Sequence, residues 1–260
     1  MMAYSSLHER TLYTNKAIRF IAGEGVIEYD IRSAGFNICK QFELLPEKKI
    51  QELEVLDKKE RHVAIGKLQR ADKTLSEKLK EGFAKCREAF FKYNEVTDDD
   101  ILSIKKDAIF IIGKRYEHLR FGKYIEFVPK HVFHSYIYLN DCEFYIGEDE
   151  LACKGIKDEL LPLHKDYMLD LITEYMNLLR IGNESGQLEF IKEVASAYRG
   201  KRLQMGYYRE LNNQSLFRPI TQIKIMNNAL GYTDFNLDLK YLDISFNYTH
   251  YIIPLYQILV

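Results

Sequence analysis

The chain has 260 residues, of which 47% are hydrophobic and 29% are charged. This length and composition predict one large or two small folded domains, and they exclude a tail-like or low-complexity protein. The 37 Lys and Arg residues balance 38 Asp and Glu residues, which excludes an overall basic or acidic protein but leaves room for a local basic patch.

The first half of the chain predicts strands followed by helices. Residues 17–31 have the pattern of a strand, a glycine-containing turn and a second strand that ends at Asp30. Residues 43–95 are helical in composition, and Pro46 suits a first helical turn. Apolar residues at three- and four-residue spacing then predict one buried stripe along a long helix: Leu68, Leu75, Leu79, Phe83, Cys86 and Phe90.

The second half begins with a predicted hairpin over residues 101–112, which turns at Lys105 and Lys106 and has Asp107 at the start of its second strand. Further strands are predicted at 124–128, 132–139 and 143–146, and helix is predicted over 157–198 with a break at 182–186. The order of strand, helices, hairpin, strands and helices predicts an α+β fold rather than regularly alternating β/α units.

The cysteines and the apolar runs indicate the compartment. The four cysteines are scattered without a C-x-x-C pair, which predicts buried free thiols in a reducing compartment rather than a zinc site. No run of eighteen apolar residues exists, and the N-terminus lacks an apolar signal core. We therefore expect a cytoplasmic protein without a membrane partner.

Two aspartates stand out by their apolar surroundings. Asp30 ends one apolar strand, and Asp107 lies in a second one. A carboxylate there is costly unless it is paired, hydrogen-bonded or bound to a cation. If the two strands lie side by side, the two carboxylates meet, and their repulsion favours a divalent metal between them. The alternative is that each aspartate merely ends a strand or caps a turn.

These segments resemble the palm domain of family B DNA polymerases, most of all the phage-type, protein-primed members. Residues 28–38 (EYDIRSAGFNI) resemble motif A, in which an aspartate ends the first palm strand. Residues 103–111 (SIKKDAIFI) resemble the motif C hairpin, and a long helix runs directly into it. Residues 150–156 (ELACKGI) resemble the lysine-bearing strand that passes from palm to thumb. The resemblance covers roughly residues 18–160.

The resemblance implies an organisation and a set of site residues. Residues 1–42 and 96–156 correspond to an antiparallel palm, 43–95 to short helical fingers and 157–260 to a helical thumb and C-terminal region. Asp30 and Asp107 are the implied catalytic ligands of Mg²⁺ or Mn²⁺. The implied nucleotide-binding residues are Ile31, Ser33, Ala34 and Gly35 of the backbone after Asp30, with Lys67 and Arg70 from the fingers. Lys154 is expected near the primer or the incoming nucleotide.

A basic segment interleaved with aromatic residues begins at Tyr198 and suits a surface that tracks a nucleic-acid backbone. Its members join Lys154 as expected nucleic-acid-binding residues: Arg199, Lys201, Arg202, Tyr207 and Arg209. The alternatives are a basic loop with core tyrosines here, and a solvated helix face for Lys67 and Arg70.

The chain departs from the family pattern at two informative positions. Lys105 replaces the first of the two usual motif C aspartates, which puts activity in doubt. Gly35 stands where the family has an aromatic residue that excludes ribonucleotides, so the resemblance predicts tolerance of ribonucleotides unless Phe36 takes that role.

The leading hypothesis is a nucleotidyltransferase that adds nucleotides to a nucleic-acid 3′ end by a two-metal mechanism. Its partners are DNA or RNA, nucleoside triphosphates and other replication subunits, and a phage origin follows from the resemblance. The first alternative is a catalytically inactive palm-derived scaffold or nucleic-acid-binding subunit, which Lys105 favours. The second is a protein-interaction factor that uses the aromatic C-terminal third.

Overall fold

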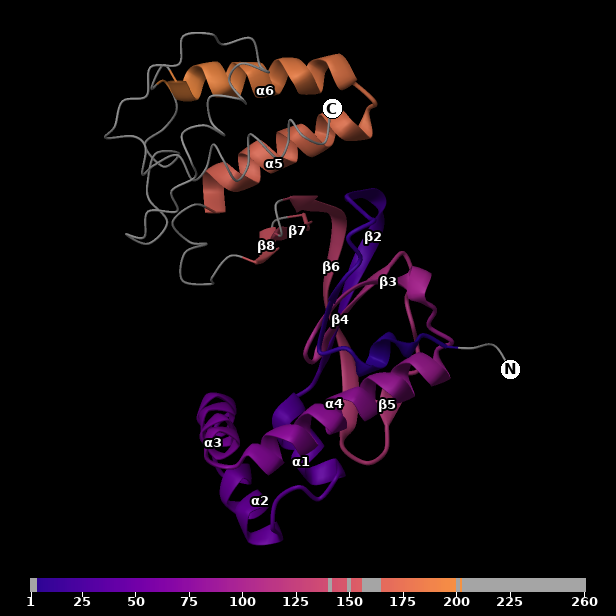
Figure 1. Cartoon of the computed structure of the whole chain (residues 1–260), viewed down its shortest axis with the longest axis vertical. Helices are drawn as coiled ribbons and strands as arrows, with labels where there is room; N and C mark the ends of the chain where they lie inside the picture. The colour runs from indigo at the N-terminus through magenta and orange to yellow at the C-terminus, as the bar shows by residue number, and fades with distance from the viewer. Residues whose placement is uncertain (1–3, 140–141, 149–150, 156–164, 200–201, 203–260) are drawn as a thin grey trace. The chain divides into compact units, whose positions relative to one another are not determined.

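The computed structural model describes residues 4–139, 142–148, 151–155, 165–199 and 202 (Figure 1). The chain divides into two compact units. The first comprises Met1–Ile18 and Glu24–Phe133, and the second comprises Arg19–Gly23 and His134–Val260. Antiparallel strands and, in the described ranges, six α-helices confirm the predicted mixed α and β composition.

The first unit contains an antiparallel sheet in the order β1-β3-β4-β2-β6, and β5 pairs with β6. The strands are β1 (Leu12–Thr14), β2 (Phe20–Ile31), β3 (Ile101–Lys105), β4 (Ala108–Ile112), β5 (Arg120–Phe121) and β6 (Ile125–Leu139). The predicted hairpin is confirmed as β3 and β4, but Lys106 and Asp107 form its turn. Asp107 therefore precedes the second strand instead of lying in it.

Strands β2 and β6 are each longer than the sequence predicted. The expected turn within residues 17–31 is wrong, because β2 continues through Gly23 and Gly25, which have φ values of 88° and 78°. Glycine adopts these positive φ angles without a Cβ clash, so the strand bends without ending. Strand β6 likewise continues through Pro129, where two separate strands were expected.

Four helices of the first unit connect β2 to the hairpin: α1 (Ala34–Gln41), α2 (Glu47–Glu54), α3 (Lys58–Ala71) and α4 (Lys73–Tyr93). The single long helix expected here is wrong, because Asp72 separates α3 from α4. Asp72 has an extended backbone and accepts a hydrogen bond from the backbone N–H of Thr74, so it caps α4. The predicted stripe residues Leu75, Leu79, Cys86 and Phe90 are nevertheless buried along α4.

The core of the first unit lies between the sheet and its helices. Ile27, Tyr29 and Ile31 of β2 belong to the same buried cluster as Phe90 and Phe91 of α4. The Tyr29 and Phe90 rings are 5.2 Å apart between their centroids. Because side chains alternate along a strand, this packing directs Glu28 and Asp30 to the opposite face of β2.

The second unit combines the end of β6 with two more strands and two helices. Strand β7 (Cys142–Ile146) pairs antiparallel with β6 on one side and with β8 (Leu151–Lys154) on the other. Helices α5 (Lys165–Arg180) and α6 (Glu184–Arg199) pack against each other (Figure 1). The predicted strand at 143–146 and the helical break near 182 are confirmed, and Lys154 lies in a strand, β8.

The structure also bears on the expected state of the cysteines and on the search for membrane-spanning helices. All four cysteines are buried free thiols, as predicted. No helix in the described ranges is both long and apolar enough to span a membrane.

Two helical glycines, one in α4 and one in α3, are expected to change the stability of the protein in opposite directions when replaced by alanine. An ideal Cβ at Gly82 lies 2.5 Å from Cγ2 of Ile38 and 3.3 Å from Phe42, so Gly82→Ala overpacks this contact. We expect a loss of about 1–3 kcal/mol in the free energy of unfolding. Gly66 of α3 has open space at its Cβ position, and Gly66→Ala is expected to gain about 0.5–1 kcal/mol. Urea denaturation measures the free energy of unfolding of both variants, and equal effects would contradict the close contact of Gly82 with α1.

Candidate functional site

The register of the sheet brings the two predicted aspartates together. Asp30 of β2 pairs with Ala108 of β4, and Asp107 immediately precedes Ala108 in the hairpin turn. The helices α1 to α4 lie between these strands in the sequence, so the two carboxylates come from segments seventy-seven residues apart. We call Asp30 and Asp107 the carboxylate pair.

The carboxylate pair is electrostatically strained. Asp107 is half-buried, and its pKa is raised because burial penalises the charged carboxylate and because the charge of Asp30 repels it. Hydrogen bonding and the positive charges of Lys106 and Lys130 oppose this rise only in part. A raised carboxyl pKa from burial and a like charge is a recurrent property of functional sites.

Glu28 and Lys130 extend the site on the same face of the sheet. The Glu28 residue is only 5% exposed and lies two positions before Asp30 on β2. The Nζ of Lys130, on β6, lies 3.5 Å from Oδ2 of Asp30 and 3.9 Å from Oε1 of Glu28. The Lys130 side chain is 50% exposed, so its ammonium is held at the edge of the site by charge rather than by burial.

Lys105 points its ammonium group toward a neighbouring strand. Its Nζ donates a hydrogen bond of 2.8 Å to Oγ1 of Thr14 on β1. Among the described residues, Lys130 forms an ion pair with Asp30, and the sequence analysis did not single it out. Its signal in the sequence is weak, because a lysine in a strand is ordinarily a solvated edge residue.

The donor set suits a hard divalent cation. Asp30, Asp107 and Glu28 offer only carboxylate oxygens, which Mg²⁺ and Mn²⁺ prefer. Within the described ranges, no group of three or more His, Cys, Asp or Glu side chains is already arranged as a metal-binding cluster. A cation at the carboxylate pair would accordingly take its remaining ligands from water or phosphate, as Mg²⁺ commonly does.

The segment after Asp30 turns directly into helix α1. Ile31 and Ala34 are buried, and Ser33 has a left-handed backbone with a φ of 47°. The Ser33 side chain does not cap the helix, although its carbonyl accepts hydrogen bonds from the backbone N–H groups of Phe36 and Asn37. The first N–H groups of α1 therefore have no capping side chain from Ser33.

The positions expected to control sugar selectivity lie in the helical layer. An ideal Cβ at Gly35 lies 3.6 Å from Ile65 of α3, an ordinary contact distance. Phe36 is buried, and the guanidinium of Arg61 lies 4.5 Å from its ring centroid. Phe36 thus packs within the helices, which leaves Gly35 without an aromatic substitute from its neighbour.

Lys67 and Arg70 are exposed and lie one helical turn apart on α3, as their spacing predicted. No hydrogen bond or ion pair among the described residues joins either side chain to the carboxylate pair. Arg61, one of their basic neighbours, is not a solvated face residue. It donates hydrogen bonds to the carbonyl oxygens of Leu53 and Leu56.

The expected nucleic-acid-binding residues belong to the second unit. Lys154 is the last residue of β8 and is half-exposed, and Arg199 is the last residue of α6. Arg202 is exposed and donates a hydrogen bond of 3.1 Å to Oγ of Ser196. The other three lie outside the described residues: Lys201, Tyr207 and Arg209.

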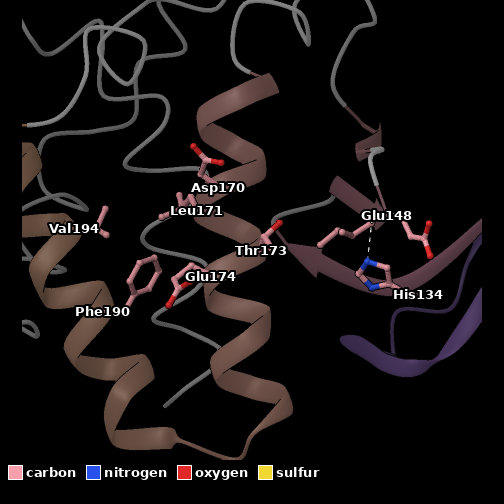
Figure 2. A pocket seen from close by; sticks show the side chains of 10 residues that line it. His134, Glu148, Asp170, Leu171, Thr173, Glu174, Phe190 and Val194 are labelled. Carbon is pink, nitrogen blue, oxygen red and sulfur yellow. Dashed lines mark hydrogen bonds between the residues drawn. The ribbon is translucent and has the colours of Figure 1, made fainter.

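The second unit also contains a cavity of about 560 Å³ between its strands and helices (Figure 2). His134 and Glu148 line it from the strand side, and Thr173, Glu174 and Phe190 line it from α5 and α6. Nε2 of His134 is 3.0 Å from the carbonyl oxygen of Gly147, and Nδ1 is 2.8 Å from Oγ of Ser135. Both ring nitrogens of His134 thereby have hydrogen-bond partners in this wall.

The raised pKa of Asp107 predicts a pH-dependent cost to stability. Because the folded state holds the proton of Asp107 more tightly than the unfolded state, the wild type loses stability as pH rises from the ordinary value of 3.8 through the raised pKa. Asp107→Asn removes this cost and is expected to stabilise the protein at pH 7. Denaturation at pH 3.5 and pH 7 tests this, and the advantage should vanish at pH 3.5.

Comparison with known families identifies the family of the chain. Residues 2–260 match the family model described as the bacteriophage PBS1 gene 130 protein, and the chain belongs to this family. This supports the phage origin that the resemblance predicted. No curated protein matches the chain.

Proposed function

We propose that this phage-family protein is a palm-type nucleotidyltransferase in which Asp30 and Asp107 bind the catalytic divalent cations. The single observation that carries the proposal is the carboxylate pair. Two aspartates distant in sequence meet at the end of neighbouring strands, in the order of elements that motif A and motif C require.

The architecture of the first unit is compatible with this chemistry. Strand β2 carries Asp30, four helices follow, and the β3–β4 hairpin then carries Asp107 beside β2. The helices pack on the face that contains Tyr29, so the carboxylates of β2 lie on the other face. A palm-type site needs this separation, because one face must form the core while the other faces the substrate.

The charges of the site support binding of a cation. Burial and repulsion from Asp30 both disfavour the ionised form of Asp107, and a bound cation would offset both effects. When bound, divalent cations at such a site activate a 3′-hydroxyl and neutralise the departing pyrophosphate. The proposed role of Asp30 and Asp107 is to remain ionised and to fix the position of the cation.

The residues around the pair have proposed roles in binding the nucleotide. The backbone at Ile31, Ser33, Ala34 and Gly35 would face the triphosphate, since the helix start offers N–H donors to an anion. Lys67 and Arg70 would contact phosphate from α3, and Lys154 with the basic residues from Arg199 to Arg209 would contact the nucleic-acid backbone.

A second candidate function is a palm-derived scaffold that binds nucleic acid without catalysis. The observation that favours it is Lys130, whose ammonium lies 3.5 Å from Asp30 and already neutralises part of the site. In a scaffold this lysine permanently replaces the metal. In an enzyme it moves aside when the cation binds, which its half-exposed side chain permits.

Extension of a primed DNA or RNA template with Mg²⁺ or Mn²⁺ separates these candidates. Incorporation that requires the cation supports the enzyme. Template binding without any incorporation supports the scaffold. Failure of both binding and incorporation would contradict both candidates.

A further inference from the structure

A fully buried arginine lies behind the turn that carries Asp107. Arg87 of α4 is 1% exposed, and burial lowers the pKa of its guanidinium to about 10, so it remains charged at neutral pH. A buried charge is tolerated only when it is paired or hydrogen-bonded. The guanidinium donates to the carbonyl oxygen of His8 at 2.9 Å from Nε and to that of Lys106 at 2.6 Å from Nη1.

The second of these hydrogen bonds acts on the peptide group that joins Lys106 to Asp107. Lys106 has a φ of 59°, a left-handed conformation that costs energy in a residue with a Cβ. Its N–H group donates to the carbonyl oxygen of Thr11 at 2.9 Å, and its carbonyl accepts from Arg87. Both polar groups of the Lys106 backbone are thus fixed, which orients the backbone from which the Asp107 side chain projects.

We propose that Arg87 is a positioning residue that holds the Lys106–Asp107 turn so that the Asp107 carboxylate meets a divalent cation beside Asp30. The inference rests on the proposed cation site. It adds a residue outside both polymerase-like motifs, at the back of the hairpin. The negative charge of Asp107 in turn favours the charged form of the buried guanidinium.

The forked geometry of the guanidinium is the reason that lysine cannot replace it. Arginine offers donors from two nitrogens in one plane, whereas lysine has a single ammonium on a flexible stem. Arg87→Lys keeps the positive charge but cannot span the carbonyl oxygens of His8 and Lys106 with the same geometry. We therefore expect a turn that still forms but no longer holds Asp107 in one orientation.

Mn²⁺ affinity, measured by titration calorimetry on the full chain, tests the inference without requiring activity. We expect Arg87→Lys to weaken binding about 10-fold or more, as loss of an outer-shell partner does in metal sites. Arg87→Gln, which removes the buried charge but keeps one amide donor, should weaken it as well, and it serves if the lysine variant does not fold. Urea denaturation confirms that each variant is folded at the temperature of the titration.

Two matched controls distinguish positioning from general destabilisation. Arg61→Lys alters an arginine that also donates to two backbone carbonyl oxygens, but far along the chain from the hairpin, and should leave Mn²⁺ affinity within about twofold. Gly82→Ala destabilises the α1–α4 contact and should likewise leave the affinity unchanged in the folded protein.

The outcomes separate this inference from the proposed function. Wild-type binding of Mn²⁺ that is lost in Asp107→Asn but unchanged in Arg87→Lys and Arg87→Gln would overturn the role of Arg87 and leave the cation site in place. Equal weakening in the Arg87 and Arg61 variants would also overturn it. If the wild type does not bind Mn²⁺, the cation site itself is wrong, and the inference is overturned with it.

Discussion

Asp30→Asn and Asp107→Asn are each expected to lower primer extension by about 10²–10³-fold or more, the scale of losing one preorganised group that stabilises transition-state charge. Asparagine preserves the size of the side chain and removes its charge, so the effect reports on the cation and not on packing. Asp107→Asn is expected to combine this loss with a gain in stability at pH 7, because burial and the charge of Asp30 both disfavour ionised Asp107.

The combination of lower activity and higher stability is the informative result. A carboxylate retained only to end a strand or cap a turn would give no loss of activity and no gain in stability. Asp99→Asn, at an exposed position of the 3-10 helix η2 (Asp98–Asp100), is the matched control and should change neither quantity. Full extension by either the Asp30 or the Asp107 variant would contradict the assignment of that residue.

Arg87→Met is expected to lower the free energy of unfolding by about 2–4 kcal/mol, because each hydrogen bond to a charged group contributes about 1.5–3 kcal/mol and relief of the buried charge offsets part of this. The substitution keeps an unbranched side chain in the core while removing the hydrogen bonds to His8 and Lys106. The loss should appear as a lower urea midpoint with an unchanged slope.

Arg61→Met provides the comparison for this loss. Arg61 makes the same kind of hydrogen bonds to Leu53 and Leu56, but it is only half-buried, so water can replace the guanidinium there. We expect a cost of about 1 kcal/mol, close to the net value of an ordinary hydrogen bond. A cost for Arg87→Met no larger than that for Arg61→Met would mean that burial of the Arg87 guanidinium adds nothing to the fold.

The hairpin over residues 101–112 was predictable because short-range patterning decides it, although its turn lies one residue later than the pattern suggested. The face of Asp30 was predictable in the same way, since side chains alternate along a strand. The meeting of Asp30 with Asp107 depends in addition on the pairing of β2 with β4, which the sequence analysis gave only as a condition.

The features that the sequence analysis missed include two side chains, Lys130 and Arg87, whose roles depend on long-range contacts. Lys130 approaches Asp30 only because β6 lies beside β2, and Arg87 reaches Lys106 across nineteen residues only because α4 packs behind the hairpin. In the sequence, a lysine in a strand and an arginine in an amphipathic helix both look like ordinary surface residues. The break at Asp72 was missed because the apolar spacing continues across it, whereas Asp72 has an extended backbone and its side chain accepts the hydrogen bond from the Thr74 N–H that begins α4.

The most direct measurement of the central claim is anomalous scattering from crystals soaked in Mn²⁺. The account predicts a peak within bonding distance of carboxylate oxygens from both Asp30 and Asp107, with the Nζ of Lys130 displaced from its position 3.5 Å from Asp30. No peak at the carboxylate pair, with Lys130 still beside Asp30 at a saturating concentration of Mn²⁺, would contradict it.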